Sequence, residues 1–112
     1  MKPYVPDVGD LIDLEFDDTK GHEQAGRRPA LVLSPFAYNE KSSRVLACPV
    51  TTKPRGSPWD VPIPPGNQYA NGVVISDQVR SLDWRARNAS KRGRVPNLVV
   101  DQVKDNIVKL LN

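Results

Sequence analysis

The sequence predicts a mainly β protein: a small, mostly antiparallel barrel closed by one C-terminal helix. Eleven prolines and seven glycines divide the 112 residues into short pieces, and most of these pieces have the apolar patterns of β-strands. Only the last segment differs, because its apolar residues recur at spacings of three and four, as in an amphipathic helix. The length fits a single domain over residues 1–112.

The first two predicted strands have different patterns. Residues 10–16 alternate, with Ile12, Leu14 and Phe16 on one face and acidic side chains on the other, which is typical of a half-buried strand. Residues 28–34 form a continuous apolar run bounded by Pro29 and Pro35, which is typical of a central strand. We therefore expect the second strand to lie inside the sheet.

The remaining segments complete the expected barrel. Residues 44–52 are a third strand candidate, and residues 60–63 form a short edge strand that carries Pro62. A buried strand over residues 72–75 is followed by a further strand over residues 78–82. A helix over residues 96–111 begins with Pro96 in its first turn and carries an apolar face made of Val99, Val100, Val103, Ile107, Leu110 and Leu111.

The composition excludes several classes of protein. Apolar residues make up 38% and charged residues 26% of the chain, which is too apolar for a disordered tail, and no stretch approaches the roughly 20 apolar residues that span a bilayer. The N-terminus lacks the apolar core of a signal peptide, so we expect a cytoplasmic protein. A lone Cys48 and a lone His22 exclude an internal disulfide and argue against a zinc site. We expect a chemistry that needs no metal or cofactor.

The net charge of +3 hides an uneven distribution. Residues 1–18 contain six acids and one lysine, whereas residues 80–94 contain six cations and one acid. A basic segment of this kind favours a polyanionic partner such as nucleic acid, and the alternative is an ordinary solvated surface.

Polar residues gather where three predicted strands end. If these strands pair antiparallel in sequence order, the loops at residues 17–27 and 53–59 meet at one end of the sheet, beside Arg28 and Thr51. This end would hold general acid–base candidates, cations and hydroxyl groups, namely His22, Glu23, Gln24, Arg27, Arg28, Thr51, Thr52, Lys53 and Arg55.

Such a set suits the cleavage of an RNA phosphodiester, because the RNA itself supplies the nucleophile in its 2′-hydroxyl. The protein then needs a base, donors for the charge that develops on the phosphate oxygens, and an acid or cation at the leaving oxygen. Arginine fits the phosphate role because its planar guanidinium stays charged. Structural roles stay open for the same residues: Arg28 paired with Glu23 on the surface, Thr51 as a strand former, and His22 as a solvated side chain. Trp59 and Trp84 can each stack on a base or pack in the core.

Several motifs, in order along nearly the whole chain, closely resemble the MazF/PemK (Kid) toxins of bacterial toxin–antitoxin systems. The most specific stretch is Gly-His-Glu-Gln at residues 21–24 followed by Arg-Arg-Pro at residues 27–29. Shorter matches include Tyr-Asn at 38–39, Cys-Pro-Val-Thr-Thr at 48–52, residues 72–81, and Asp-Trp-Arg-Ala-Arg at 83–87.

This resemblance implies a homodimeric, sequence-specific and metal-independent endoribonuclease that cleaves single-stranded mRNA and so inhibits translation and growth. Its products would carry a 2′,3′-cyclic phosphate (or 3′-phosphate) and a 5′-hydroxyl, and its fold would be the SH3-like small barrel shared with the gyrase poison CcdB. A MazE-like antitoxin would neutralise it by laying an acidic tail in the RNA groove.

The family's catalytic arginine and threonine fall on Arg28 and Thr51, and its acidic residue falls on Glu23. Arg28 would bind the scissile phosphate and assist the leaving oxygen, Thr51 would donate to a phosphate oxygen, and Glu23 or His22 would be the base. The expected RNA contacts are Gln24, Arg27, Thr52, Lys53, Arg55, Asp77, Gln78, Arg80, Arg85 and Arg87.

Two features separate this chain from related toxins. Some PemK-like members use a histidine, an arginine and an aspartate, and this chain has His22 and Asp77 but Ile75 at the arginine position. This departure favours the MazF-like pair. A non-enzymatic toxin that binds a protein such as gyrase is an alternative, although CcdB acts through a C-terminal Trp-Gly-Ile and this chain ends in Leu-Leu-Asn. A third reading is an RNA-binding module without activity.

Overall fold

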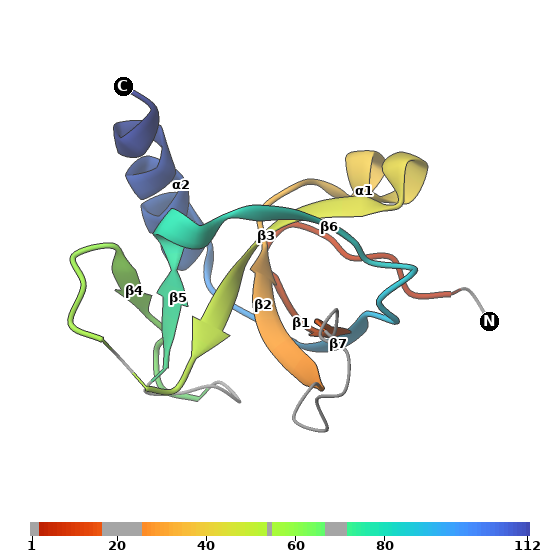
Figure 1. The fold of residues 1–112 in the computed structure, drawn as a ribbon, viewed down its shortest axis with the longest axis horizontal. Coiled ribbons are helices and arrows are strands. Elements are labelled where there is room, and N and C mark those ends of the chain that lie inside the picture. The colour runs from red at the N-terminus through yellow and green to blue at the C-terminus, as the bar shows by residue number, and fades with distance from the viewer. Residues whose placement is uncertain (1–2, 17–25, 54, 67–71) are drawn as a thin grey trace.

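The computed structural model describes residues 3–16, 26–53, 55–66 and 72–112. Its seven-stranded sheet has the order β4-β5-β3-β2-β1-β7, with β6 paired to β3 off this path (Figure 1). The strands are β1 (Asp10–Glu15), β2 (Arg27–Val32), β3 (Arg44–Thr51), β4 (Asp60–Pro62), β5 (Val73–Ile75), β6 (Arg80–Asp83) and β7 (Ser90–Arg94). The helices are α1 (Phe36–Ser42), the 3-10 turn η1 (Ser76–Gln78) and α2 (Asn97–Leu111).

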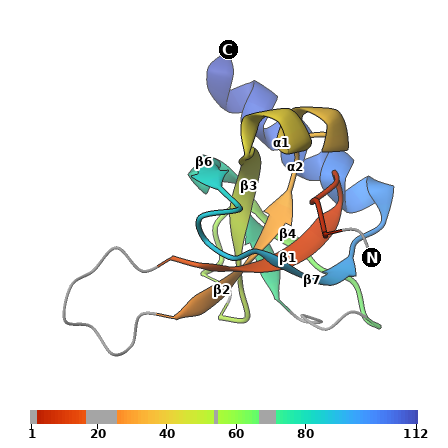
Figure 2. The same cartoon turned by 90° about the vertical axis from the view of Figure 1, so that its right-hand side faces the viewer.

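Strand β3 holds the sheet together because it has three partners. Along one edge, its residues 44–47 pair with β6 and its residues 50–51 pair with β5. Along the other edge, residues 47–49 pair with β2. All the pairs are antiparallel, and the sheet curves strongly around β3 (Figures 1 and 2). The predicted antiparallel barrel with a C-terminal helix is therefore confirmed.

The central strands are buried on both faces. Leu11, Leu31 and Val50 point into one core, which is covered by Val99, Val100 and Val103 of α2. Their neighbours along the strands point the other way, into a second core completed from β6 and the turn after it: Ile12, Leu14, Ala30, Val32, Val45, Ala47, Leu82 and Trp84. Burial on both faces explains the continuous apolar run of the second strand.

Helix α1, the turn η1 and strand β7 were not predicted from the sequence, and several predicted boundaries differ from the structure by one or two residues. Helix α1 has only seven residues, too few to show a helical period, and it is held by Asn39, whose amide donates to the carbonyl oxygens of Pro6 (2.8 Å) and Ser34 (2.9 Å). Strand β7 is entirely polar or glycine, so it has no apolar alternation. The strand expected at residues 78–82 begins at Arg80, because residues 76–78 form η1. Pro96 occupies the N-cap position just before α2 begins at Asn97, and so lies outside the first turn in which it was expected.

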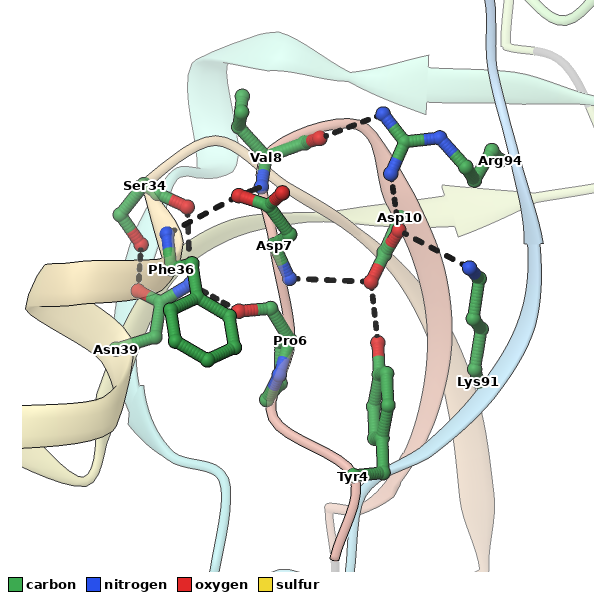
Figure 3. A network of polar contacts seen from close by, with 10 residues as sticks. All are labelled: Tyr4, Pro6, Asp7, Val8, Asp10, Ser34, Phe36, Asn39, Lys91 and Arg94. Atoms are coloured by element: carbon green, nitrogen blue, oxygen red, sulfur yellow. Dashed lines mark hydrogen bonds and ion pairs between the residues drawn. The ribbon is translucent and has the colours of Figure 1, made fainter. Parts of the chain in front are cut away.

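The acidic and basic segments of the sequence meet in the fold. Strand β7 lies beside β1, and the buried carboxylate of Asp10 accepts a hydrogen bond from Arg94 Nη1 at 2.7 Å, with Lys91 Nζ 3.7 Å away (Figure 3). Tyr4 donates its hydroxyl to the same carboxylate at 2.6 Å, and burial, followed by this hydrogen bond, raises the pKa of Tyr4. Arg92 pairs with Asp13. Three cations of the basic segment, Lys91, Arg92 and Arg94, therefore pair with carboxylates of β1.

Among the described residues, no helix has the length and apolar character needed to cross a bilayer.

Candidate active site

The strand register places Arg28 and Thr51 at the same end of the sheet. Strand β2 pairs with β3 so that Ala30 lies opposite Pro49. Continued by two residues, this antiparallel register brings Arg28 opposite Thr51. Both residues also line one pocket of about 510 Å³, which we call the Arg28 pocket. Its lining is Phe16, Arg28, Pro29, Pro49, Val50, Thr51, Thr52, Ile75 and Gln78.

Arg28 is exposed at this pocket. Its partner across the β1–β2 ladder is the apolar Leu14, and in the described part of the chain no acidic side chain forms an ion pair with it. A guanidinium in this position keeps its donors for a ligand, and its planar fork matches the oxygen atoms of a phosphate.

The hydroxyl of Thr51 is oriented by the chain that follows it. The backbone N–H of Lys53 donates to Thr51 Oγ1 at 3.1 Å. A hydroxyl group has one proton to donate and two lone pairs, so this contact uses a lone pair and leaves the proton for a ligand. A cation and a hydroxyl donor therefore line the same pocket, each at the end of a strand fixed by sheet hydrogen bonds.

Phe16 is a pocket residue that the sequence reasoning did not select. The alternating pattern assigned it to the core face, and its ring does pack against the second core. Because β1 ends there, the same ring also lines the Arg28 pocket. Arg80 and Arg87 flank it, with Cζ atoms 5.5 and 5.9 Å from the ring centroid. These two predicted RNA contacts therefore lie next to the pocket.

Several predicted RNA contacts have protein partners. Arg27 Nη2 donates to the carbonyl oxygens of Asp13 (2.9 Å) and Asn88 (2.6 Å), so it connects β2 to β1 and to the turn before β7. Arg85 stacks on the ring of Trp84 with its Cζ 4.3 Å from the centroid, in a separate pocket lined by the N-terminal segment, α1 and the turn after β6. Arg55 is paired with the carboxylates of Asp60 and Asp77.

The tryptophans and the remaining candidates are placed differently. Trp84 is 5% exposed and donates its Nε1 to Asn39 O at 2.8 Å, which confirms its role in the core, whereas Trp59 is half-buried. Thr52 and Gln78 line the Arg28 pocket, and Lys53 is exposed beside it. His22, Glu23 and Gln24 lie outside the described residues.

Cys48 lies behind this end of the sheet and is not poised as a nucleophile. Burial, with a smaller contribution from the Asp77 carboxylate, raises the pKa of the Cys48 thiol to about 12. At neutral pH the group therefore remains a protonated thiol, whereas the thiolate is the reactive form.

Comparison with known proteins gives consistent matches over the whole fold. Residues 7–111 match the family model of the PemK-like, MazF-like toxin of type II toxin–antitoxin systems. The chain is 49% identical over 108 residues to the endoribonuclease toxin MazF of Escherichia coli (strain K12), covering 96% of both chains. It is 31% identical over 106 residues to the endoribonuclease PemK of Escherichia coli, covering 92% of this chain and 80% of that protein. Its fold matches the crystal structure of MazE-MazF (Form-II) from Deinococcus radiodurans with a TM-score of 0.92 and 47% identity over 97% of each chain.

Proposed function

The chain belongs to the family of PemK-like, MazF-like toxins of type II toxin–antitoxin systems, and we propose that it cleaves single-stranded mRNA at specific sequences and so inhibits translation and growth. The observation that carries this proposal is the juxtaposition of Arg28 and Thr51 at one pocket, within a fold whose relatives are endoribonucleases.

The geometry supports a reaction in which the RNA supplies the nucleophile. The 2′-oxygen loses its proton to the base and attacks the adjacent phosphorus, and the bond from phosphorus to the 5′-oxygen breaks. The 5′-oxygen takes up a proton from water, so the products are a 2′,3′-cyclic phosphate and a 5′-hydroxyl. Arg28 binds the non-bridging oxygens and stabilises the charge that develops on them and on the leaving oxygen. The Thr51 hydroxyl donates a hydrogen bond to a phosphate oxygen.

The base that removes the 2′-hydroxyl proton is Glu23 or His22. The variants Glu23→Gln and His22→Gln show which residue is the base. With the base present, kcat/KM falls at low pH because the base becomes protonated, and this fall disappears in the variant that lacks the base. We expect the fall to disappear in Glu23→Gln and to remain in His22→Gln; the opposite result assigns the base to His22.

The proposed function includes an antitoxin, a second copy of the chain and a cellular location. A MazE-like antitoxin neutralises the toxin, as the complexes of related MazF proteins indicate. We also propose a homodimer, which the exposed apolar side chains of α2 support: Leu98, Val108, Leu110 and Leu111. The cytoplasm is the site of action because the substrate is mRNA. Sedimentation equilibrium tests the dimer, and a monomer mass at micromolar concentration would contradict it.

Primer extension over a long RNA of mixed sequence, incubated with the protein in EDTA, tests the proposed function. We expect breaks at a discrete set of sites, and mass spectrometry of the 5′ fragments should show a 2′,3′-cyclic phosphate (or 3′-phosphate) at their ends. Breaks that need added Mg²⁺ would refute the metal-independent chemistry. An RNA that stays intact after long incubation would contradict the proposed cleavage and favour an RNA-binding module or a toxin that binds a protein target.

A further inference from the structure

The three residues of η1 each contact a different part of the molecule. Ser76 Oγ donates to Trp59 O and accepts from Asn106 Nδ2 of α2 at 3.1 Å. Gln78 lines the Arg28 pocket. Between them, the carboxylate of Asp77 lies 3.9 Å from Arg55 Nη2. The position of one pocket wall therefore depends on how η1 is held.

Arg55 connects η1 to Asp60, the first residue of β4. Its Nη2 donates to Asp60 Oδ1 at 3.2 Å, and its backbone N–H donates to Asp60 Oδ2 at 3.3 Å. The Asp60 side chain is only 6% exposed, so this ion pair is partly shielded from water and less screened than a surface pair. Arg55 stands four residues after Thr51 and three after Thr52, both of which line the pocket.

We propose that Arg55 is a positioning residue of the endoribonuclease: by bridging Asp60 and Asp77, its guanidinium holds Thr51 and Thr52 at a fixed separation from Gln78. This inference rests on the proposed function. It departs from the sequence-based expectation that Arg55 binds RNA, because the group that would contact a phosphate is already shared between two carboxylates.

The two roles predict opposite effects at Asp77. If Arg55 positions the pocket, then removing either partner loosens the same contact, and a displacement of the reacting groups lowers kcat. If Arg55 is instead a phosphate ligand, then Asp77→Asn removes a nearby negative charge and leaves RNA binding unchanged or stronger.

The experiment is a double-mutant cycle on cleavage of a short RNA that contains one cut site. We expect kcat to fall about tenfold in both Arg55→Ala and Asp77→Asn, with no further loss in the double variant, because coupled residues are not additive. We expect KM and the salt dependence of binding to stay near wild type. Lys41→Ala, which removes an exposed cation of α1, is the matched control and should cleave like the wild type.

Two results would overturn the positioning role. One is additive effects, with Arg55→Ala raising KM and reducing the salt dependence. The other is measured without RNA: the backbone N–H of Ser76, which donates to Trp59 O at 3.2 Å, should lose protection against hydrogen exchange in both Arg55→Ala and Asp77→Asn. Protection equal to the wild type contradicts the bridge. A wild-type protein that leaves RNA intact contradicts the proposed function instead, and the exchange measurement still decides on the bridge.

Discussion

Two consecutive arginines at the start of β2 have different surroundings. Arg27 lies across the ladder from Glu15 and forms an ion pair with it at 3.7 Å, in addition to its backbone contacts. Arg28 lies across from Leu14 and faces the Arg28 pocket. The two positions are equally basic in the sequence. The register of one strand pair therefore decides which cation stabilises the fold and which remains available to a ligand.

The cations of β7 extend the comparison. β1 places Asp10 and Asp13 against β7, so Lys91, Arg92 and Arg94 pair with one or the other of these two carboxylates. On the other side of β1, Asp13 lies opposite Pro29, which offers no cation. A register shift of one residue would place Arg28 opposite an acid instead of Leu14. The acidic first strand thus neutralises β7 and leaves Arg28 to the pocket.

The largest expected effect separates the two neighbouring arginines. Arg28→Ala should lower kcat/KM for RNA cleavage by about a thousandfold or more, because it removes the cation that stabilises the transition state. Its melting temperature should stay close to wild type, since Arg28 is exposed. Arg27→Ala should instead lower the melting temperature and affect cleavage far less. Equal losses of activity in the two variants would remove the distinction.

Asp10 tests the stabilising side of the comparison. Asp10→Ala removes the acceptor shared by Tyr4, Arg94 and the backbone N–H of Asp7. We expect a loss of about 2–3 kcal/mol in the free energy of unfolding, less than for a fully buried ion pair because the cations are partly exposed. Urea denaturation measures this loss, and Asp105→Ala on the exposed side of α2 should stay within about 0.5 kcal/mol of wild type. A similar stability for the two variants would show that the Asp10 network contributes little.

Thr51 tests the hydroxyl at the pocket with little change in shape. Thr51→Val keeps the branched side chain of a strand residue but removes the proton donor, so we expect kcat to fall by about tenfold to a hundredfold. Thr51→Ser keeps the donor and should retain most of the activity. A Val variant as active as the Ser variant would show that the hydroxyl is not used, and single-turnover cleavage is the measurement.

Sequence patterns predicted the strands that carry apolar side chains and the end of the sheet where Arg28 and Thr51 lie. They did not predict β7, because a strand stabilised by ion pairs across the ladder has no apolar period. They also could not separate Arg27 from Arg28, since strand patterns do not specify which residue faces an acid. Phe16 was missed for a similar reason: one ring packs in the core and lines the pocket.

The smallest expected effect concerns how many cations contact RNA. Arg80 lies beside Phe16 at the pocket, whereas Arg92 is paired with Asp13. Each phosphate contact to single-stranded RNA contributes about 0.7 to the slope of log K against log salt concentration. Arg80→Gln should therefore reduce the slope by about 0.7, and Arg92→Gln should leave it unchanged although both variants lose one positive charge. Equal slopes would mean that RNA responds to net charge alone, whereas a difference would show that the acids of β1 determine which cations are available to RNA.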